Sequence, residues 1–309
     1  MSSSFNHISV MLKETVDGLD IKPNGIYVDG TAGGGGHSFE IASRMNGGRL
    51  ICLDRDPDAI KAASERLSGF DFVTVVQSEF SKVADVLDNL SIDKIDGILL
   101  DLGVSSHQFD KAERGFSYHA DAPLDMRMSQ SGTTAADIVN SYSANELSKI
   151  FVSYADEKFA FKIANEIVNS REVSPINTTK QLADLISDCY PAKFKRDGHP
   201  ARKVFQALRI AVNGEFDEEN AVIEKAFERL NVGGRMSIIT FHSSEDRLVK
   251  QRFADYCKGC TCPSDFPVCV CNNKPRARLV NKKPIVASKS EVEMNPRSRS
   301  AKLRVLEKL

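Results

Sequence analysis

The feature that most constrains the fold is a glycine-rich stretch directly after a short apolar run. The apolar residues 26–28 end at Asp29, and five glycines then fall between positions 30 and 36. A helical pattern of apolar residues begins at Phe39. Glycine permits positive φ angles and close approach of a ligand to the backbone, and the next helix presents free N–H groups. The stretch therefore predicts strand, tight loop and helix, the unit with which doubly wound α/β proteins hold nucleotide-like ligands.

Further apolar segments alternate with helical patterns along the first third of the chain. Strands are expected at residues 26–28, 50–54, 72–76 and 95–103, and again at 233–242, 284–287 and 302–306. Such alternation predicts a mostly parallel, Rossmann-like sheet covered by helices on both faces.

The alternation stops in the middle of the chain. Residues 109–205 are rich in turn signals and then in helical periodicity, with a helix cap expected at Asn177–Thr179. We expect an inserted, mainly helical domain at 109–205, and an α/β core made of residues 1–108 and 206–309.

Bulk composition indicates an ordinary globular protein. The chain has 309 residues, 41% hydrophobic, with a net charge of −1. No apolar run is long enough to span a bilayer, and residues 1–7 lack the pattern of a secretion signal, so a cytoplasmic location is expected. Residues 272–309 carry eleven Lys or Arg against three Glu, and 193–203 are also basic. Such regions fit local phosphate contact, or solvated loops.

Acidic residues at the expected strand ends indicate which ligand the loop holds. Asp29, Asp54 and Asp101 each close a strand, and Asp54 lies 21 positions after Gly33. An acid at the end of the second strand can bind a ribose diol. Asp29 would repel a pyrophosphate but suits a cation, and no Gly-Lys-Ser/Thr follows the loop. These features favour S-adenosylmethionine; the alternative is a tight turn whose acids only cap helices.

One later helix carries a polar stripe. Arg202, Gln206, Arg209 and Asn213 are spaced by 4, 3 and 4 residues, which places them on one helical face. Such a face can bind RNA phosphates or bases, although a solvated face produces the same pattern.

Five cysteines are crowded near the C-terminus: Cys257, Cys260, Cys262, Cys269 and Cys271. Four thiolates can form a tetrahedral zinc site. Free thiols and a redox pair are the alternatives. The segment 257–271 is expected within the C-terminal part of the α/β core.

Several strings together resemble a known family. They are DGTAGGGGHS (29–38), LDRDP (53–57), DGILLDLGVSS (96–106), PLDMRM (123–128), FQALRIAVN (205–213), FHSSEDR (241–247) and NPRSRS (295–300). In this order they resemble the bacterial small-subunit ribosomal RNA cytosine-N4 methyltransferases, the RsmH or MraW family, from His7 to the C-terminus.

The resemblance implies a class I S-adenosylmethionine-dependent methyltransferase fold with an inserted helical domain. It implies methylation of the N4 amine of one cytidine in the decoding region of 16S ribosomal RNA, on free RNA or on the small subunit. The implied cofactor contacts are Gly35, Gly36, His37, Asp54, Phe80, Asp101 and Gln108.

The residues at the end of the fourth expected strand supply the candidate catalytic group. Asp101 is the candidate for a polar role near the amine, because the Asp/Asn-Pro-Pro-aromatic pattern of many amino-methyltransferases is replaced here by DLGV (101–104). Two other functions remain open: a methyltransferase acting on DNA or protein, and a non-catalytic nucleic-acid-binding module. The oligomeric state is undetermined.

Overall fold

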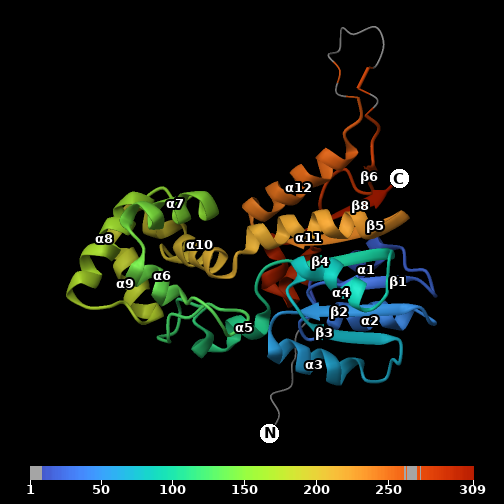
Figure 1. The fold of residues 1–309 in the computed structure, drawn as a ribbon. Helices are drawn as coiled ribbons and strands as arrows, with labels where there is room; N and C mark the ends of the chain where they lie inside the picture. Colours follow the sequence, from blue (N-terminus) through green and yellow to red (C-terminus); the bar gives the residue numbers. More distant parts are fainter. Residues whose placement is uncertain (1–8, 261, 263–269, 272) are drawn as a thin grey trace. The chain divides into compact units, whose positions relative to one another are not determined.

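The chain forms two compact units, which are described separately. The computed structural model describes residues 9–260, 262, 270–271 and 273–309. The first unit comprises residues 1–103 and 217–309, and the second comprises 104–216 (Figure 1). The helical unit thus extends beyond the 109–205 expected from the sequence, because Phe205 and Leu208 on α10 (Arg202–Asn213) pack into its core.

The first unit is built on one mixed sheet. Its strands are β1 (Ile26–Asp29), β2 (Arg49–Asp54), β3 (Val73–Gln77), β4 (Ile95–Asp101), β5 (Leu230–Thr240), β6 (Ala277–Leu279), β7 (Ile285–Val286) and β8 (Lys302–Lys308). The order is β3-β2-β1-β4-β5-β8-β6, with β7 also paired to β8. The first five strands are parallel and β8 runs antiparallel to β5. The predicted Rossmann-like, mostly parallel sheet is confirmed.

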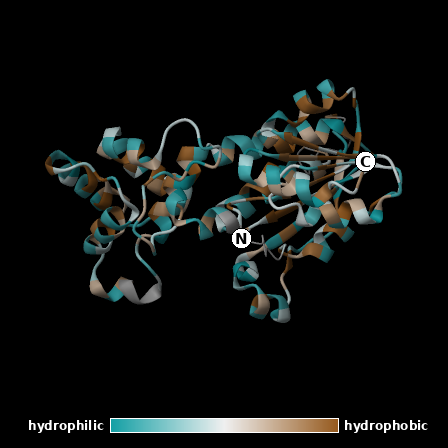
Figure 2. Ribbon diagram, turned by 90° about the horizontal axis from the view of Figure 1, so that it is seen from below, coloured by the Kyte–Doolittle hydropathy of each residue, from teal (hydrophilic) through white to brown (hydrophobic). Residues whose placement is uncertain are grey.

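Helices cover both faces of this sheet. On one face lie α1 (Leu12–Leu19), α2 (Gly36–Arg44) and α3 (Pro57–Leu67), and on the other α4 (Val83–Asn89), α11 (Glu215–Arg229) and α12 (Ser243–Cys257). Leu50 and Cys52 on β2 pack with the first set, whereas Ile51 and Leu53 pack with the second. Consecutive strand side chains point to opposite faces, so the apolar strands lie between two helical layers, as the hydropathy colouring shows (Figure 2).

The second unit is helical. Its elements are α5 (Ser106–Asp110), η2 (Ala112–Arg114), α6 (Ala135–Ser141), α7 (Ala144–Ala155), α8 (Ala160–Val173), α9 (Thr179–Cys189), η3 (Ala192–Asp197) and α10. Capping boxes begin three helices, at Thr134, Ser143 and Thr178. Each satisfies otherwise unpaired N–H groups at a helix start, and the expected cap before α9 is confirmed.

Several short elements, most of them near the chain ends, were not expected from the sequence. These are α1, β6, α13 (Lys289–Met294), η1 (Phe80–Lys82) and η4 (Pro296–Ser300). Strand β6 has three residues, too few for an alternating pattern to be recognised. No helix in the described ranges combines the length and the apolarity needed to cross a bilayer.

Candidate functional site

The three acids singled out in the sequence lie at one edge of the sheet. Asp29 ends β1, Asp54 ends β2 and Asp101 ends β4. Strand β1 pairs in parallel with both β2 and β4, so these carboxyl ends meet at the same edge. Open α/β sheets bind their ligands at this edge.

The glycine loop joins β1 to α2 at that edge. Gly33 and Gly35 have φ angles of 51° and 75°, a left-handed conformation that disfavours other residues. Gly35 is the N-cap of α2. A Cβ on Gly36 would lie 1.9 Å from Ser9 Oγ. The loop therefore requires glycine at 33 and 35 for backbone conformation, and Gly36 lies against the N-terminal segment.

Asp29 shapes this loop from within. Its side chain is fully buried, accepts a hydrogen bond from the Thr31 N–H at 3.1 Å, and accepts one from the Ser38 hydroxyl at 2.6 Å. Burial raises its pKa to about 6. We expected Asp29 to face a cationic ligand, but both of its oxygens are bound to the loop and to the start of α2.

Asp54 holds the loop from the neighbouring strand. One carboxylate oxygen accepts the Gly33 N–H at 2.8 Å, and the other accepts the Asp56 N–H at 2.9 Å. Burial raises the pKa of Asp54 to about 6. Each oxygen has a further lone pair, so this geometry leaves Asp54 able to accept hydrogen bonds from a ligand diol.

Among the three acids, Asp101 has the pKa that is raised the most. Burial first, and then the negative charges of Asp29 and Glu245, raise its pKa to about 8. Its backbone N–H donates to Thr31 Oγ1 at 2.6 Å. Within the described part of the chain, its buried Oδ1 has no hydrogen-bond partner. A buried carboxyl group of this kind is stabilised by a nearby cation or by a proton.

His37 lies between Asp101 and the N-terminal segment. Its Nε2 is 3.0 Å from the Val10 carbonyl oxygen, which can only accept, so Nε2 carries a proton. Its Nδ1 is 3.8 Å from Asp101 Oδ2. The imidazole is buried, and it was expected at the helix start, where the structure places it.

Glu245 is a residue of this edge to which the sequence alone assigned no role. It lies in the first turn of α12, beyond the end of β5, is fully buried, and accepts the backbone N–H groups of Phe241 and His242 at 2.8 and 3.2 Å. Its charge contributes to the raised pKa of Asp101. The string FHSSEDR contained this residue, but only the tertiary structure brings it toward Asp101.

Two further residues, Phe80 and Gln108, were predicted to contact the cofactor, and the structure places only Phe80 beside the glycine loop. Phe80 begins η1, and its Cβ lies 3.5 Å from the position that a Cβ on Gly30 would take, so it borders the loop. Gln108 belongs to the second unit, where it caps the turn at Ser105. The contact of Gln108 with a cofactor stays a prediction.

The polar stripe on α10 differs from a uniformly exposed face. Arg202 is exposed and Gln206 is half-buried. Arg209 makes a two-pronged ion pair with Glu215, at 2.8 and 2.6 Å, with its side chain 12% exposed. Asn213 is buried; it donates to the Met126 carbonyl and accepts from the Met128 N–H, both at 2.9 Å. The expectation of four ligand-facing groups is corrected for these two, because internal partners engage them.

The cysteines do not all gather. Cys260, Cys262 and Cys271 have their sulfur atoms within 4.8 Å of one another. Cys257 instead packs against the apolar core beneath α12, and burial raises its pKa. Cys269 lies outside the described residues.

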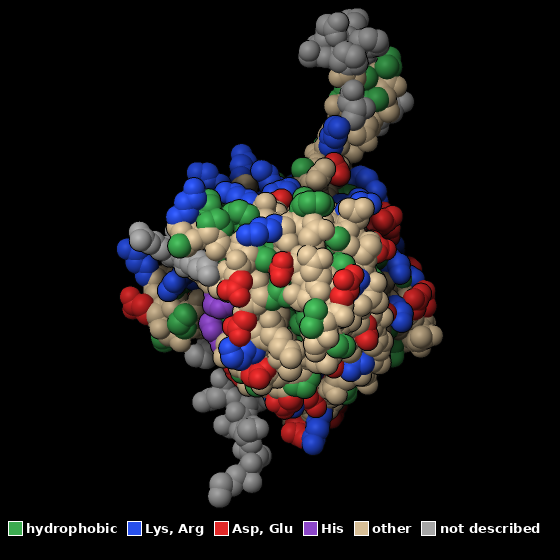
Figure 3. Space-filling view, turned by 90° about the vertical axis from the view of Figure 1, so that its left-hand side faces the viewer, with side chains coloured by type: hydrophobic (Ala, Val, Ile, Leu, Met, Phe, Trp, Pro, Cys, Tyr) green, Lys and Arg blue, Asp and Glu red, His purple; other side chains and the backbone are tan. Residues whose placement is uncertain are grey.

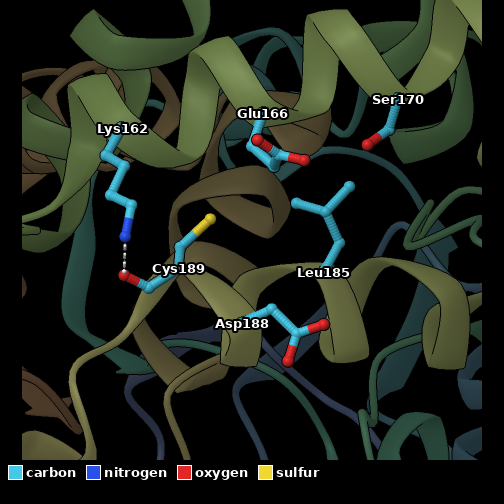
Figure 4. A pocket seen from close by; sticks show the side chains of 6 residues that line it. All are labelled: Lys162, Glu166, Ser170, Leu185, Asp188 and Cys189. Atoms are coloured by element: carbon cyan, nitrogen blue, oxygen red, sulfur yellow. Dashed lines mark hydrogen bonds between the residues drawn. The ribbon is translucent and has the colours of Figure 1, made fainter.

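The helical unit has a groove of its own, about 390 Å³ in volume. Lys162, Glu166 and Ser170 line it from α8, and Leu185, Asp188 and Cys189 from α9 (Figure 4). Lys162 Nζ donates to the Cys189 carbonyl at 2.8 Å. The residues that line this groove are of mixed charge and include no glycine loop, so the groove offers no cofactor site comparable to the sheet edge.

Acidic and basic side chains are both present on the face of the molecule shown in Figure 3.

Comparison with known proteins shows the family to which this chain belongs. The model of the MraW methylase family matches residues 4–309. The chain belongs to this family. Two relatives named ribosomal RNA small subunit methyltransferase H, from Clostridium botulinum (strain Loch Maree) and Paenibacillus sp. (strain JDR-2), are 53% and 55% identical, over 99% of this chain and 99% and 100% of their own. A solved rRNA methylase from Streptococcus thermophilus is 13% identical over 98% of this chain and 99% of its own, with a TM-score of 0.44.

Proposed function

We propose that this protein transfers a methyl group from S-adenosylmethionine to the N4 amine of a cytidine in the decoding region of 16S ribosomal RNA, in the cytoplasm. The observation that carries the proposal is the sheet edge where the glycine loop meets two acids able to receive a ligand: Asp54, whose oxygens keep free lone pairs, and Asp101, whose buried Oδ1 has no hydrogen-bond partner among the described residues. Buried carboxyl groups of this kind favour a cationic ligand, and a sulfonium compound is one. Membership of the methylase family over residues 4–309 supports the same activity.

Asp54 and the loop would hold the cofactor. Bound S-adenosylmethionine supplies a methyl group whose S–C bond breaks as the N4–C bond forms. Asp54 accepts two backbone N–H groups and so stands ready, without rearrangement, to accept a ribose diol. Phe80 beside the loop offers an apolar wall for the adenine ring.

Asp101 would receive the proton that the amine loses. The exocyclic amine is a poor nucleophile, because its lone pair is delocalised into the cytosine ring, and an acceptor for its proton restores nucleophilicity. Without cofactor, the raised pKa of about 8 keeps this carboxyl group mostly protonated at neutral pH; a bound sulfonium cation would lower that pKa and leave the carboxylate able to accept a proton. His37 carries its proton on Nε2, and its Nδ1 lies 3.8 Å from the second oxygen of Asp101, too far for a direct hydrogen bond between these two atoms.

The substrate test uses methyl transfer. Small subunits from a strain lacking the enzyme, and naked DNA in a parallel reaction, are each incubated with labelled S-adenosylmethionine and the protein, and nucleosides are analysed by mass spectrometry. N4-methylated cytidine in the small-subunit RNA is expected. Label only on naked DNA or on ribosomal protein would refute the proposed substrate, and failure to bind the cofactor in calorimetry would indicate a non-catalytic module.

The roles of Asp101 and Asp54 can be separated. Asp101→Asn is expected to lower kcat by at least about a hundred-fold at saturating cofactor, as for loss of a general base. Asp54→Asn is expected to weaken cofactor binding about ten-fold while leaving kcat nearly unchanged. A normal kcat in Asp101→Asn, with only weaker cofactor binding, would overturn the proton-acceptor role.

Arg202 is proposed as the RNA contact of α10. Its side chain is exposed at the start of the helix, whereas Arg209 is engaged by Glu215. Arg202→Ala is expected to weaken binding to small subunits and to reduce the salt dependence of that binding. Lys180→Ala is the matched control, since this exposed lysine already pairs with Asp184 at 2.7 Å.

A further inference from the structure

Three cysteine thiols meet on the chain segment that connects α12 to β6. The sulfur atoms of Cys260, Cys262 and Cys271 all lie within 4.8 Å of one another, and those of Cys260 and Cys271 are 3.7 Å apart. The first two cysteines follow α12 and the third precedes β6. The cluster therefore joins two segments that run in opposite directions, visible in Figure 1 as the extension beyond α12.

Hydrogen bonds that do not involve the thiols hold the two ends of this segment together. The Asn273 side-chain amide donates to the carbonyls of Lys258 and Gly259, at 3.3 and 2.8 Å. The Arg276 N–H donates to the Tyr256 carbonyl at 2.9 Å. The chain path itself thus brings Cys271 back to Cys260, which lowers the entropy cost of gathering ligands around an ion.

The spacing of the sulfurs fits metal coordination. Tetrahedral zinc with Zn–S bonds of about 2.3 Å places its ligand sulfurs about 3.8 Å apart, close to the 3.7 Å between Cys260 and Cys271. A disulfide would need the sulfurs about 2.0 Å apart. The Val270 N–H points to Cys262 Sγ at 3.3 Å and the Asn273 N–H to Cys271 Sγ at 3.5 Å. Such backbone donors stabilise thiolate charge, as partners around metal ligands do.

We propose that Cys260, Cys262 and Cys271 supply three of the four ligands of a zinc ion that cross-links the two arms of this extension. The site is separate from the sheet edge and does not depend on the proposed methyl transfer. Cys257 is excluded from it, because this thiol packs against the apolar core and burial raises its pKa, which disfavours the thiolate.

Metal analysis of the full-length protein tests the proposal. The protein is purified without a chelator or a metal-affinity tag from zinc-supplemented cells, and zinc per chain is measured by mass spectrometry. About one zinc per chain is expected for the wild type and for the matched control Cys257→Ser. Cys260→Ser, Cys262→Ser and Cys271→Ser are each expected to hold at least about ten-fold less.

Two further measurements distinguish loss of the metal ligands from misfolding of the variants and from a disulfide. Cobalt added to the demetallated wild type is expected to give the thiolate charge-transfer and strong visible absorption of tetrahedral cobalt, which the three variants lack although their circular dichroism spectra match that of the wild type. Wild-type protein with almost no zinc, or equal zinc in all variants, would overturn the site. Titration of two thiols fewer than the sequence contains, in denatured and never-reduced protein without metal, would instead indicate a Cys260–Cys271 disulfide.

Discussion

Replacing Asp101 with Asn should make the cofactor-free protein more stable while harming its activity. Asn has nearly the same shape but cannot ionise. In the folded chain the pKa of Asp101 is raised to about 8, chiefly by burial, from the ordinary value of 3.8. Folding therefore requires this carboxyl group to stay protonated at neutral pH, while the unfolded chain gains free energy by ionising it.

The size of the effect follows from these two pKa values. Below pH 3.8 both states are protonated and Asp101 contributes nothing to the pH dependence. From there to pH 8 its contribution falls by up to about 1.4 kcal/mol per pH unit, which amounts to about 4 kcal/mol at pH 7 for a fully shielded group. Because the side chain is 18% exposed, solvent screening reduces this, and we expect a gain of about 2 kcal/mol.

Urea unfolding without cofactor, at pH 5, 6, 7 and 8, measures this gain. Asp101→Asn should exceed the wild type by an amount that grows with pH. Asp246→Asn is the control at the same sheet edge. Its ion pairs with Arg304 and Lys302 lower its pKa, so this substitution should destabilise at neutral pH. The reasoning is refuted if Asp101→Asn is no more stable than the wild type at pH 7, or if its advantage does not shrink toward pH 5.

Two predictions concern the helical unit. Asn213→Ala should lower the free energy of unfolding by about 2 kcal/mol, because it leaves the buried Met126 carbonyl unpaired; an unchanged melting temperature in calorimetry would contradict this. Gly115→Ala should cost about 3 kcal/mol or more, since Gly115 has a φ angle of 72° and a Cβ there would lie 2.3 Å from the Pro123 carbonyl oxygen. Gly132→Ala, with a φ angle of 87° and nothing within 4 Å, should cost only about 1 kcal/mol, and equal losses in the two variants would refute the steric argument.

The helical character of the insertion could be predicted from the sequence, but the residues at which it begins and ends could not. Helical periodicity identified a helical insertion, because period depends on neighbouring residues alone. The end of the insertion depends on what α10 packs against. Phe205 and Leu208 could have served either unit by their pattern, and the structure shows them in the helical core.

For the candidate site, too, some features follow from the sequence alone and others only from the tertiary structure. The sequence by itself determined the strand–glycine loop–helix unit and the acids Asp29, Asp54 and Asp101 at strand ends, because conformational demands on glycine and the shared edge of parallel strands are local rules. Only the tertiary structure decided which acids remain available to a ligand. Asp29 is bound to its own loop, whereas Oδ1 of Asp101 is buried without a partner among the described residues.

Partners distant along the chain were beyond any local pattern. Asn213 looked like one of four equivalent polar groups, yet it pairs with Met128, 85 positions earlier. Glu245 reaches the surroundings of Asp101 only because β4 and β5 are adjacent in the sheet. Polar side chains take the partners that folding brings within hydrogen-bond distance, and that choice is made by packing rather than by spacing in the sequence.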